Sequence, residues 1–313
     1  MPYCSINLSP VPDGETYSRN GLRSIHPKLT QLFPLDLSQE EQLRQARLRA
    51  DKMSVQGVQP KLSAVLKVKD ARFEIVDQGG RYLLKPNPPP FEEVPANEAV
   101  TMSMAAAVGI EIPPHGLLRA VDGSWIYFIQ RFDRTGRSRK HHVEDFAQLT
   151  GATRETKYDS SLERVVAVVE RYCTFPALEK PRLARRLLFC FLTGNEDMHL
   201  KNFSLTKTAG TVRLSPAYDL LNTTLVLEDA VEESALPLNG KKRKLTRSLW
   251  LDYLCHERLG LPPAIIADML KEFGAAVPRW REMLSRCGLS AARQTAYLEL
   301  LVERLERLGI SPA

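Results

Sequence analysis

The segment Asn195-Glu-Asp-Met-His-Leu-Lys-Asn202 is the most informative part of this chain. Asp197 and Asn202 are five residues apart, and Asp219 follows 22 residues after Asp197. This set suits phosphoryl transfer, in which one carboxylate orients the attacking hydroxyl and accepts its proton while hard oxygen ligands hold Mg²⁺ against the phosphates. The apolar run at 187–192 predicts a helix before the segment, and 203–205 predicts a strand after it. A loop between them can present Asp197 at the mouth of a cleft.

An ordinary polar turn is the alternative interpretation of this segment. Asn, Asp, His and Lys gather in turns because their short polar side chains cap backbone groups. On residue types alone, the turn and the catalytic loop are equally good interpretations, so the rest of the chain must decide between them.

The composition indicates a globular protein with a substantial core. The chain has 313 residues, of which 43% are hydrophobic and 26% charged, and its length suits one bilobal unit. The net charge of +6 makes an anionic partner plausible, such as a nucleotide, a nucleic acid or an acidic protein face. The sequence predicts no secretory leader and contains no apolar run near the roughly 18 residues needed to span a membrane, so we expect a cytoplasmic protein without a membrane partner.

Five scattered cysteines form no CxxC pair, which favours reduced thiols over disulfides or a zinc site; they are Cys4, Cys173, Cys190, Cys255 and Cys287. The histidine spacings fit no metal-binding pattern either.

The predicted elements divide the chain into two lobes. Strands are expected at 61–68, 72–76, 81–85, 115–119 and 125–129, with one helix at 95–108 between them. Beyond Arg131 helical patterns dominate, at 162–174, 181–192, 262–273, 278–286 and 290–308. We therefore expect an α+β, bilobal, protein-kinase-like fold, with a small β-rich N-lobe over residues 1–133 and a larger all-α C-lobe over residues 134–313.

Three weaker features lie in the expected N-lobe. The loop at 53–61 contains one hydroxyl residue and one glycine that could approach phosphates, although without context a plain turn is favoured about two to one. Lys85 ends the third strand and Glu98 lies thirteen residues further on, so the two could form an ion pair. Gln130-Arg-Phe-Asp133 closes the last strand at the lobe boundary, where Phe132 could pack on an adenine ring or could simply be a core residue.

The order of these features resembles that of the HipA-family serine/threonine kinases, which are toxins of bacterial toxin–antitoxin systems. The resemblance spans residues 54–220, and it rests on Ser54-Val-Gln-Gly-Val-Gln-Pro-Lys61, Tyr82-Leu-Leu-Lys-Pro86, Asn97-Glu-Ala99, Gln130-Arg-Phe-Asp-Arg134, Asn195–Ser204 and Pro216-Ala-Tyr-Asp-Leu220. Protein kinases place a catalytic Asp and a metal-binding Asn at the same five-residue interval.

The resemblance implies ATP and Mg²⁺ as cofactors and assigns a role to each site residue. Asp197 would be the catalytic base, and Asn202 and Asp219 would bind Mg²⁺. The ATP-binding residues would be Ser54, Val55, Gln56, Gly57, Lys85, Glu98, Gln130, Phe132, Asp133 and His199. Ser54 would also be autophosphorylated as an off-switch, with Ser63 as a weaker alternative; relatives carry a second serine where this chain has Gln56.

The resemblance also implies partners. The substrate would be an aminoacyl-tRNA synthetase, with the tryptophanyl enzyme as the first expectation. A HipB-like DNA-binding antitoxin and a HipS-like small subunit would bind the protein, and DNA would be reached only through the antitoxin. The chain is about a hundred residues shorter at the N-terminus than full-length family members and most resembles the short HipT toxins. Some short relatives begin with a cysteine-rich knuckle, but here only Cys4 is present, so no zinc is expected. A catalytically silent binding module of a repressor complex and a small-molecule or lipid kinase are the alternatives.

Overall fold

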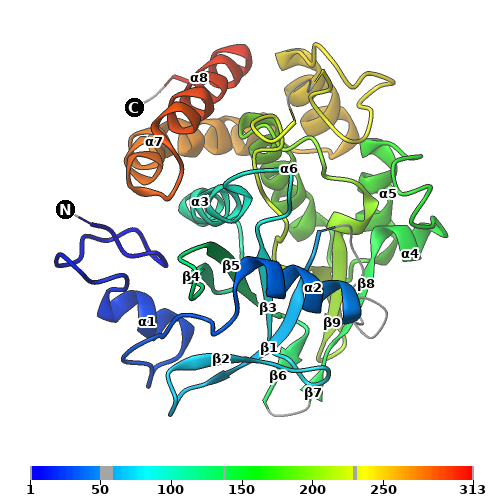
Figure 1. Ribbon diagram of the computed structural model, residues 1–313. Helices are drawn as coiled ribbons and strands as arrows, with labels where there is room; N and C mark the ends of the chain where they lie inside the picture. The colour runs from blue at the N-terminus through cyan, green and yellow to red at the C-terminus, as the bar shows by residue number, and fades with distance from the viewer. Residues whose placement is uncertain (1, 50–58, 137–138, 228–230, 312–313) are drawn as a thin grey trace. The chain divides into compact units, whose positions relative to one another are not determined.

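A computed structural model of the chain describes residues 2–49, 59–136, 139–227 and 231–311 (Figure 1). The fold is a mixture of α-helices and antiparallel β-sheets. It contains two compact units, each assembled from segments that are separate in the sequence. The first unit comprises Met1–Ser103, Pro113–Ser138 and Met283–Ser290; the second comprises Met104–Ile112, Arg139–Glu282 and Ala291–Ala313. The single boundary expected at 133/134 stays a prediction.

The first unit contains a five-stranded antiparallel sheet in the order β2-β1-β3-β5-β4 (Figure 1). Its strands are β1 (Leu62–Lys67), β2 (Arg72–Ile75), β3 (Tyr82–Pro86), β4 (His115–Arg119) and β5 (Trp125–Gln130). All five lie within one or two residues of the predicted segments, because each is a short, largely apolar segment separated from the next by turn residues.

Helices and the sheet share one core in this unit. Helix α1 (Arg19–Ile25) contributes Leu22 and Ile25 to it, and helix α2 (Gln39–Arg49) packs on β1 and β3. The ring of Phe73 lies 5.0 Å from that of Tyr82 and 5.3 Å from that of Phe128, measured between centroids. Each apolar side chain buried in this way contributes about 1.5–3 kcal/mol to folding. Helix α3 (Val94–Ala107) begins in the first unit and ends in the second.

The second unit contains a three-stranded antiparallel sheet, so the expectation of an all-α C-lobe is wrong. The strands are β8 (His142–Asp145), β9 (Ser204–Thr208) and β10 (Thr211–Leu214), in the order β10-β9-β8. Ala209 and Gly210 form the two-residue turn between β9 and β10, and both have positive φ angles, of 48° and 83°. Such turns match the twist of a hairpin. Two further short strands follow β5 in the chain: β6 (Arg134–Thr135) belongs to the first unit and β7 (Arg139–Lys140) to the second.

The helices that belong wholly or largely to the second unit are α4 (Phe146–Thr150), α5 (Leu162–Tyr172), α6 (Pro176–Leu192), the 3₁₀-helix η2 (Leu200–Asn202), the π-helix η3 (Leu249–Arg258), α7 (Pro263–Arg286) and α8 (Ala291–Leu308). Two predicted boundaries at prolines are wrong. Helix α6 begins at Pro176 and contains Pro181, and the two helices expected at 262–273 and 278–286 are one helix with Pro278 inside it. An interior proline costs about 3 kcal/mol. Full burial of Phe273 and Trp280 on either side of Pro278 offsets that cost.

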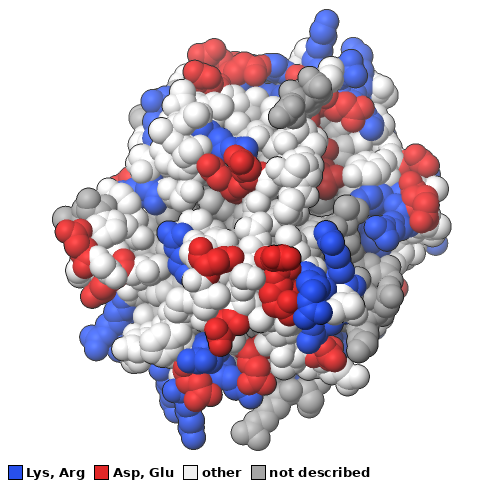
Figure 2. Space-filling view, in the orientation of Figure 1, with Lys and Arg blue, Asp and Glu red and all other residues white. Residues whose placement is uncertain are grey.

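Figure 2 shows Lys and Arg side chains interspersed with Asp and Glu on one face of the molecule. The net charge of +6 therefore produces no large patch of a single sign on this face. All five cysteines are free thiols. Within the described ranges, no helix is both long enough and apolar enough to cross a membrane.

Candidate active site

Lys85 and Glu98 form a buried ion pair in the first unit. The Nζ of Lys85 donates a hydrogen bond to Oε1 of Glu98 at 2.6 Å, and the two side chains are 5% and 1% exposed. Lys85 lies opposite Tyr127 in the β3–β5 register, and its Nζ is 5.4 Å from the centroid of the Tyr127 ring. The contact that the sequence suggested is therefore present, between the end of strand β3 and the first turns of helix α3.

Helix α3 is held at β4 by a buried histidine. His115 has Nδ1 3.2 Å from the carbonyl oxygen of Pro113, and Nε2 3.3 Å from that of Ala99 and 3.2 Å from Oγ of Ser103. Burial lowers the pKa of His115, although the two carbonyl groups favour the cation, so the ring is neutral at pH 7. These contacts hold the face of α3 with Ala99 and Ser103 against β4, and they thereby fix the orientation of Glu98 on the same helix.

The segment after β5 is ordered by an arginine–carboxylate pair. Asp133 accepts hydrogen bonds from Nε of Arg131 at 2.9 Å and from its terminal nitrogen at 2.8 Å. Burial favours the neutral carboxyl, but the hydrogen bonds and charges of Arg131 and Arg134 prevail and lower the pKa of Asp133. The backbone N–H of Gln130 donates to the carbonyl oxygen of Pro114, and Phe132 is half-buried. The adenine role expected for Gln130, Phe132 and Asp133 stays a prediction.

The loop with Asp197 begins after α6 at a glycine, Gly194, whose backbone is in the left-handed region. Gly194 has a φ of +66°, and its carbonyl oxygen accepts hydrogen bonds from the N–H groups of Thr223 and Thr224 at 2.9 and 3.2 Å. A Cβ at position 194 would lie 2.4 Å from Leu300 and 2.8 Å from Thr224. Only glycine fits both this backbone conformation and this space.

Buried Asn195 links the two acidic segments of the site. Its Oδ1 accepts a hydrogen bond from the N–H of Asp197 at 3.1 Å, and its Nδ2 donates to the carbonyl oxygen of Asp219 at 3.4 Å. Asn195 is 2% exposed, and Asp219 has a φ of +54°, a conformation that Asp tolerates better than most residues. The role of Asn195 does not follow from the sequence, because its partners are known only once the loop is folded.

Asn202 and Asp219 carry oxygen donors of the kind that Mg²⁺ prefers, and the metal-binding role expected for them stays a prediction. The Nδ2 of Asn202 donates to the carbonyl oxygen of Asp197 at 2.8 Å, which leaves the side-chain oxygen of Asn202 as its acceptor group. The described residues contain no cluster of three or more His, Cys, Asp or Glu side chains of the kind that holds a metal. Protein-bound Mg²⁺ usually takes only one or two carboxylate or amide ligands and completes its shell with water and phosphate oxygens, so a dense cluster is not needed.

Two residues that the sequence did not indicate surround Asp197 and His199. Tyr158 donates its hydroxyl to Oδ1 of Asp197 at 2.5 Å, and Nζ of Lys157 lies 2.7 Å from Nε2 of His199. Burial raises the pKa of Tyr158, and the Asp197 carboxylate adds to this. Burial also lowers the pKa of His199; Asp197 opposes that effect and Lys157 reinforces it. His199 is therefore neutral and accepts a hydrogen bond from Lys157.

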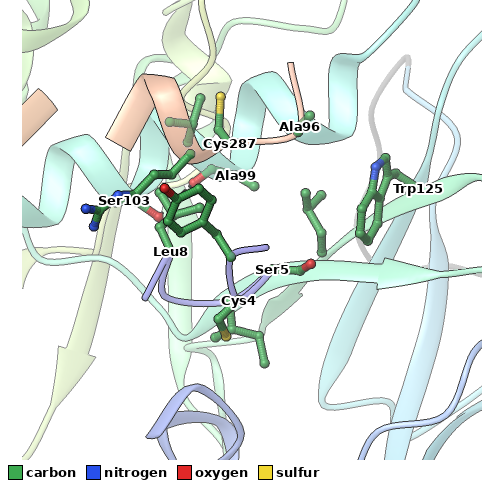
Figure 3. Close-up of a pocket in the computed structure, with 14 residues that line it drawn as sticks. Cys4, Ser5, Leu8, Ala96, Ala99, Ser103, Trp125 and Cys287 are labelled. Atoms are coloured by element: carbon green, nitrogen blue, oxygen red, sulfur yellow. Dashed lines mark hydrogen bonds between the residues drawn. The ribbon is translucent and has the colours of Figure 1, made fainter. Parts of the chain in front are cut away.

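The phosphate-binding residues Ser54, Val55, Gln56 and Gly57 lie outside the described residues. The first unit also contains a separate cavity of about 180 Å³ between the N-terminal segment, the face of α3 with Ala96, Ala99 and Ser103, and the segment around Cys287 (Figure 3). Neither Lys85 nor Glu98 lines this cavity, so it is not part of the predicted site.

Comparison with known proteins establishes the family. Residues 53–280 match the family described as the HipA-like C-terminal domain, and the chain belongs to this family. The chain is 34% identical over 269 residues to Y4dM of Sinorhizobium fredii, a candidate kinase, covering 80% of this chain and 64% of that protein. It is 24% identical over 253 residues to the serine/threonine-protein kinase toxin HipA of Shewanella oneidensis, covering 73% of this chain and 56% of that protein. The chain thus spans less than two thirds of either relative.

Solved structures show the same fold. The HipA of S. oneidensis MR-1, in complex with HipB and operator DNA, has a TM-score of 0.67 at 20% identity over 98% of this chain and 76% of that one. The proinflammatory kinase CtkA of Helicobacter pylori has a TM-score of 0.54 at 15% identity over 76% of this chain and 89% of that one. The expected HipA-like α+β fold is confirmed at this level. The HipT subtype stays a prediction.

Proposed function

We propose that this chain is an ATP- and Mg²⁺-dependent serine/threonine protein kinase. The observation that supports this most is the buried ion pair of Lys85 and Glu98. A buried ion pair is no more stable than well-packed apolar side chains of similar volume, because both charges lose their hydration. A lysine held there by a carboxylate is therefore best explained by a task, and neutralising phosphate oxygens is the task that kinases give to this residue.

Each residue of the site has a part in this reaction. Asp197 orients the substrate hydroxyl and accepts its proton, and Asn195 fixes the backbone N–H of Asp197. Glu98 holds the ammonium group of Lys85 in place for the α- and β-phosphates. Asn202 and Asp219 hold the Mg²⁺ that accompanies ATP, which supplies the transferred phosphoryl group. Because this chemistry needs little covalent help, the protein contributes mainly positioning and charge neutralisation.

We further propose that the kinase is the toxin of a bacterial toxin–antitoxin system in the cytoplasm. It phosphorylates an aminoacyl-tRNA synthetase, with the tryptophanyl enzyme as the first candidate, and phosphorylation of Ser54 switches it off. Its partners are a HipB-like antitoxin, through which it reaches DNA, and a HipS-like small subunit. The names of two similar proteins support this proposal: one is a kinase toxin, and the other is a HipA bound to HipB and operator DNA.

The test is incubation of the purified chain with Mg-ATP, followed by intact-mass and phosphopeptide analysis. We expect phosphate on Ser54 in the wild type and none on any residue in Asp197→Ala. Asp268→Ala, which removes an exposed carboxylate on α7, is the matched control and should behave as the wild type. When they are expressed in growing bacteria, the wild type and Asp268→Ala should arrest growth, whereas Asp197→Ala should allow growth.

Full growth arrest by folded Asp197→Ala would disprove the assigned base. Binding of ATP without any phosphorylation, even with tRNA synthetases added, would instead favour the silent binding module.

A further inference from the structure

The phenol of Tyr158 occupies the position that the proposed mechanism gives to the acceptor hydroxyl. Its Oη donates to Oδ1 of Asp197 at 2.5 Å, the same hydrogen bond that a substrate hydroxyl makes with a catalytic base before phosphoryl transfer. Both residues belong to the second unit, so this contact lies within one compact part of the chain.

Several contacts fix Tyr158 in this position. The N–H of Leu200 donates to the carbonyl oxygen of Lys157 at 3.3 Å, which joins the tyrosine segment to the loop of Asp197. The ring of Tyr158 meets the ring of His199 edge-on, with centroids 5.0 Å apart, and Nζ of Lys157 lies 4.8 Å from the Tyr158 centroid. The N–H of Ser160 donates to the carbonyl oxygen of Tyr158 at 2.9 Å. Because these contacts hold the backbone and the ring of Tyr158, its hydroxyl is positioned against Asp197 and does not lie there by chance.

The surroundings of the phenol suit a phosphorylated product. Tyr158 is 38% exposed and the Asp197 side chain 47%, so a phosphate on Oη can be hydrated. The ammonium group of Lys157 lies 4.8 Å from the centroid of the Tyr158 ring, so a cationic side chain is present beside the phenol. A nearby cation stabilises a phosphate dianion.

We propose that Tyr158 is a second self-phosphorylation site, modified within the same chain. The inference rests on the proposed kinase function and adds an acceptor to it. Oη of Tyr158 forms a bond to the γ-phosphorus of ATP, and the bond from that phosphorus to the β,γ-bridging oxygen breaks, with its electron pair leaving on ADP. The phenol proton passes to the Asp197 carboxylate and from there to water. The new phosphate adds bulk and negative charge next to Asp197, so modified protein cannot use this base for a second substrate.

The experiment is phosphopeptide mapping of the full chain after incubation with Mg-ATP. We expect phosphate on Tyr158 in the wild type, at a rate per molecule that does not change over a tenfold range of protein concentration. Tyr158→Phe keeps the ring contacts and lacks the acceptor, so its peptide should carry none. Asp197→Asn should slow the modification by about 10²–10⁴-fold, as expected for the loss of a positioned base.

Tyr172→Phe is the matched control, since it removes another phenol hydroxyl of the second unit, which donates to the carbonyl oxygen of Leu149. It should leave the Tyr158 phosphate unchanged. Phosphate on Ser54 or other residues, with the Tyr158 peptide observed only unmodified, would overturn this inference and leave the proposed function standing. Faster phosphorylation of other sites in Tyr158→Phe, without phosphate on Tyr158 in the wild type, would show that the phenol only blocks the base. No phosphate on any residue would overturn both proposals.

Discussion

At the scale of single residues, the carboxylate of Glu98 compensates the buried charge of Lys85. Removing one partner of a buried pair leaves an uncompensated group and typically costs about 3–5 kcal/mol. We therefore expect Lys85→Met to lower the unfolding free energy by that amount and to abolish ATP binding. The double variant Lys85→Met/Glu98→Leu should recover most of the stability and none of the ATP binding. Chemical denaturation and nucleotide titration measure the two properties separately.

The exposed pair of Lys67 and Glu74 is the matched control in the same unit. These side chains are 45% and 54% exposed and 3.2 Å apart, so Lys67→Met should cost less than about 1 kcal/mol and leave ATP binding intact. If the double variant at Lys85 and Glu98 bound ATP normally, the ion pair would be a structural feature and would no longer support the proposed function.

Residues differ in how far the sequence could predict them. Lys85 and Glu98 follow from a strand end and a helix thirteen residues later, and their contact is confirmed. Asn195 and Tyr158 could not be predicted, because each acts through a partner that only folding brings near: Tyr158 is 39 residues from Asp197 in the chain. The positions expected to bind phosphate at Ser54–Gly57 lie outside the described residues and stay predictions.

At the scale of elements, the turn that ends α6 sets the start of the catalytic loop. Gly194 combines a left-handed backbone with contacts closer than a Cβ allows. We expect Gly194→Ala to lower the unfolding free energy by more than the roughly 1–2 kcal/mol that a left-handed conformation alone costs an L-residue. It should also reduce kinase activity, because displacement of the loop moves Asn195 and Asp197. Thermal melting and a phosphorylation assay test both effects.

Gly210→Ala is the control that separates the two causes. Gly210 lies in the β9–β10 turn with a φ of +83°, and a Cβ there meets nothing within 4 Å. Gly210→Ala should lose only the unfolding free energy that a left-handed conformation costs an L-residue, and it should keep full activity. Equal losses of stability in the two variants would show that the neighbours of Gly194 yield without cost, and the loop would then not depend on close packing at this corner.

The elements also show where periodicity fails as a guide. The five strands of the first unit were predicted because turn residues separate them clearly, whereas the hairpin of β9 and β10 was missed beyond its first residues. That hairpin is short and polar at its tip, and its turn contains Ala209 in place of the usual Asn or Asp. The sequence pattern predicts helix boundaries at Pro181 and Pro278. Both prolines lie inside helices, because burial of the flanking side chains in the core stabilises the continuous helix.

At the scale of the whole molecule, the proposed function requires residues from both units. Lys85 belongs to the first unit, and Asn202 and Asp219 belong to the second. If all three act on one nucleotide, Mg-ATP must stabilise both units together. At a free concentration 100 times its dissociation constant, a ligand adds about 2.7 kcal/mol to the unfolding free energy. We therefore expect Mg-ATP to raise the melting temperature of both units, as followed by calorimetry and by hydrogen exchange at β3 and at β9.

Variants in the two units make this requirement testable. Lys85→Met in the first unit and Asp219→Asn in the second should each abolish the stabilisation of both units if the proposed function is correct, since it assigns both residues to one nucleotide. Asn tolerates the positive φ of position 219, so Asp219→Asn should remain folded. EDTA should reduce the effect in the wild type, because the proposed mechanism connects Asn202 and Asp219 to the phosphates through Mg²⁺. If Mg-ATP protected β9 fully in Lys85→Met, the second unit would bind the nucleotide alone, and Lys85 would have to be removed from the proposed mechanism.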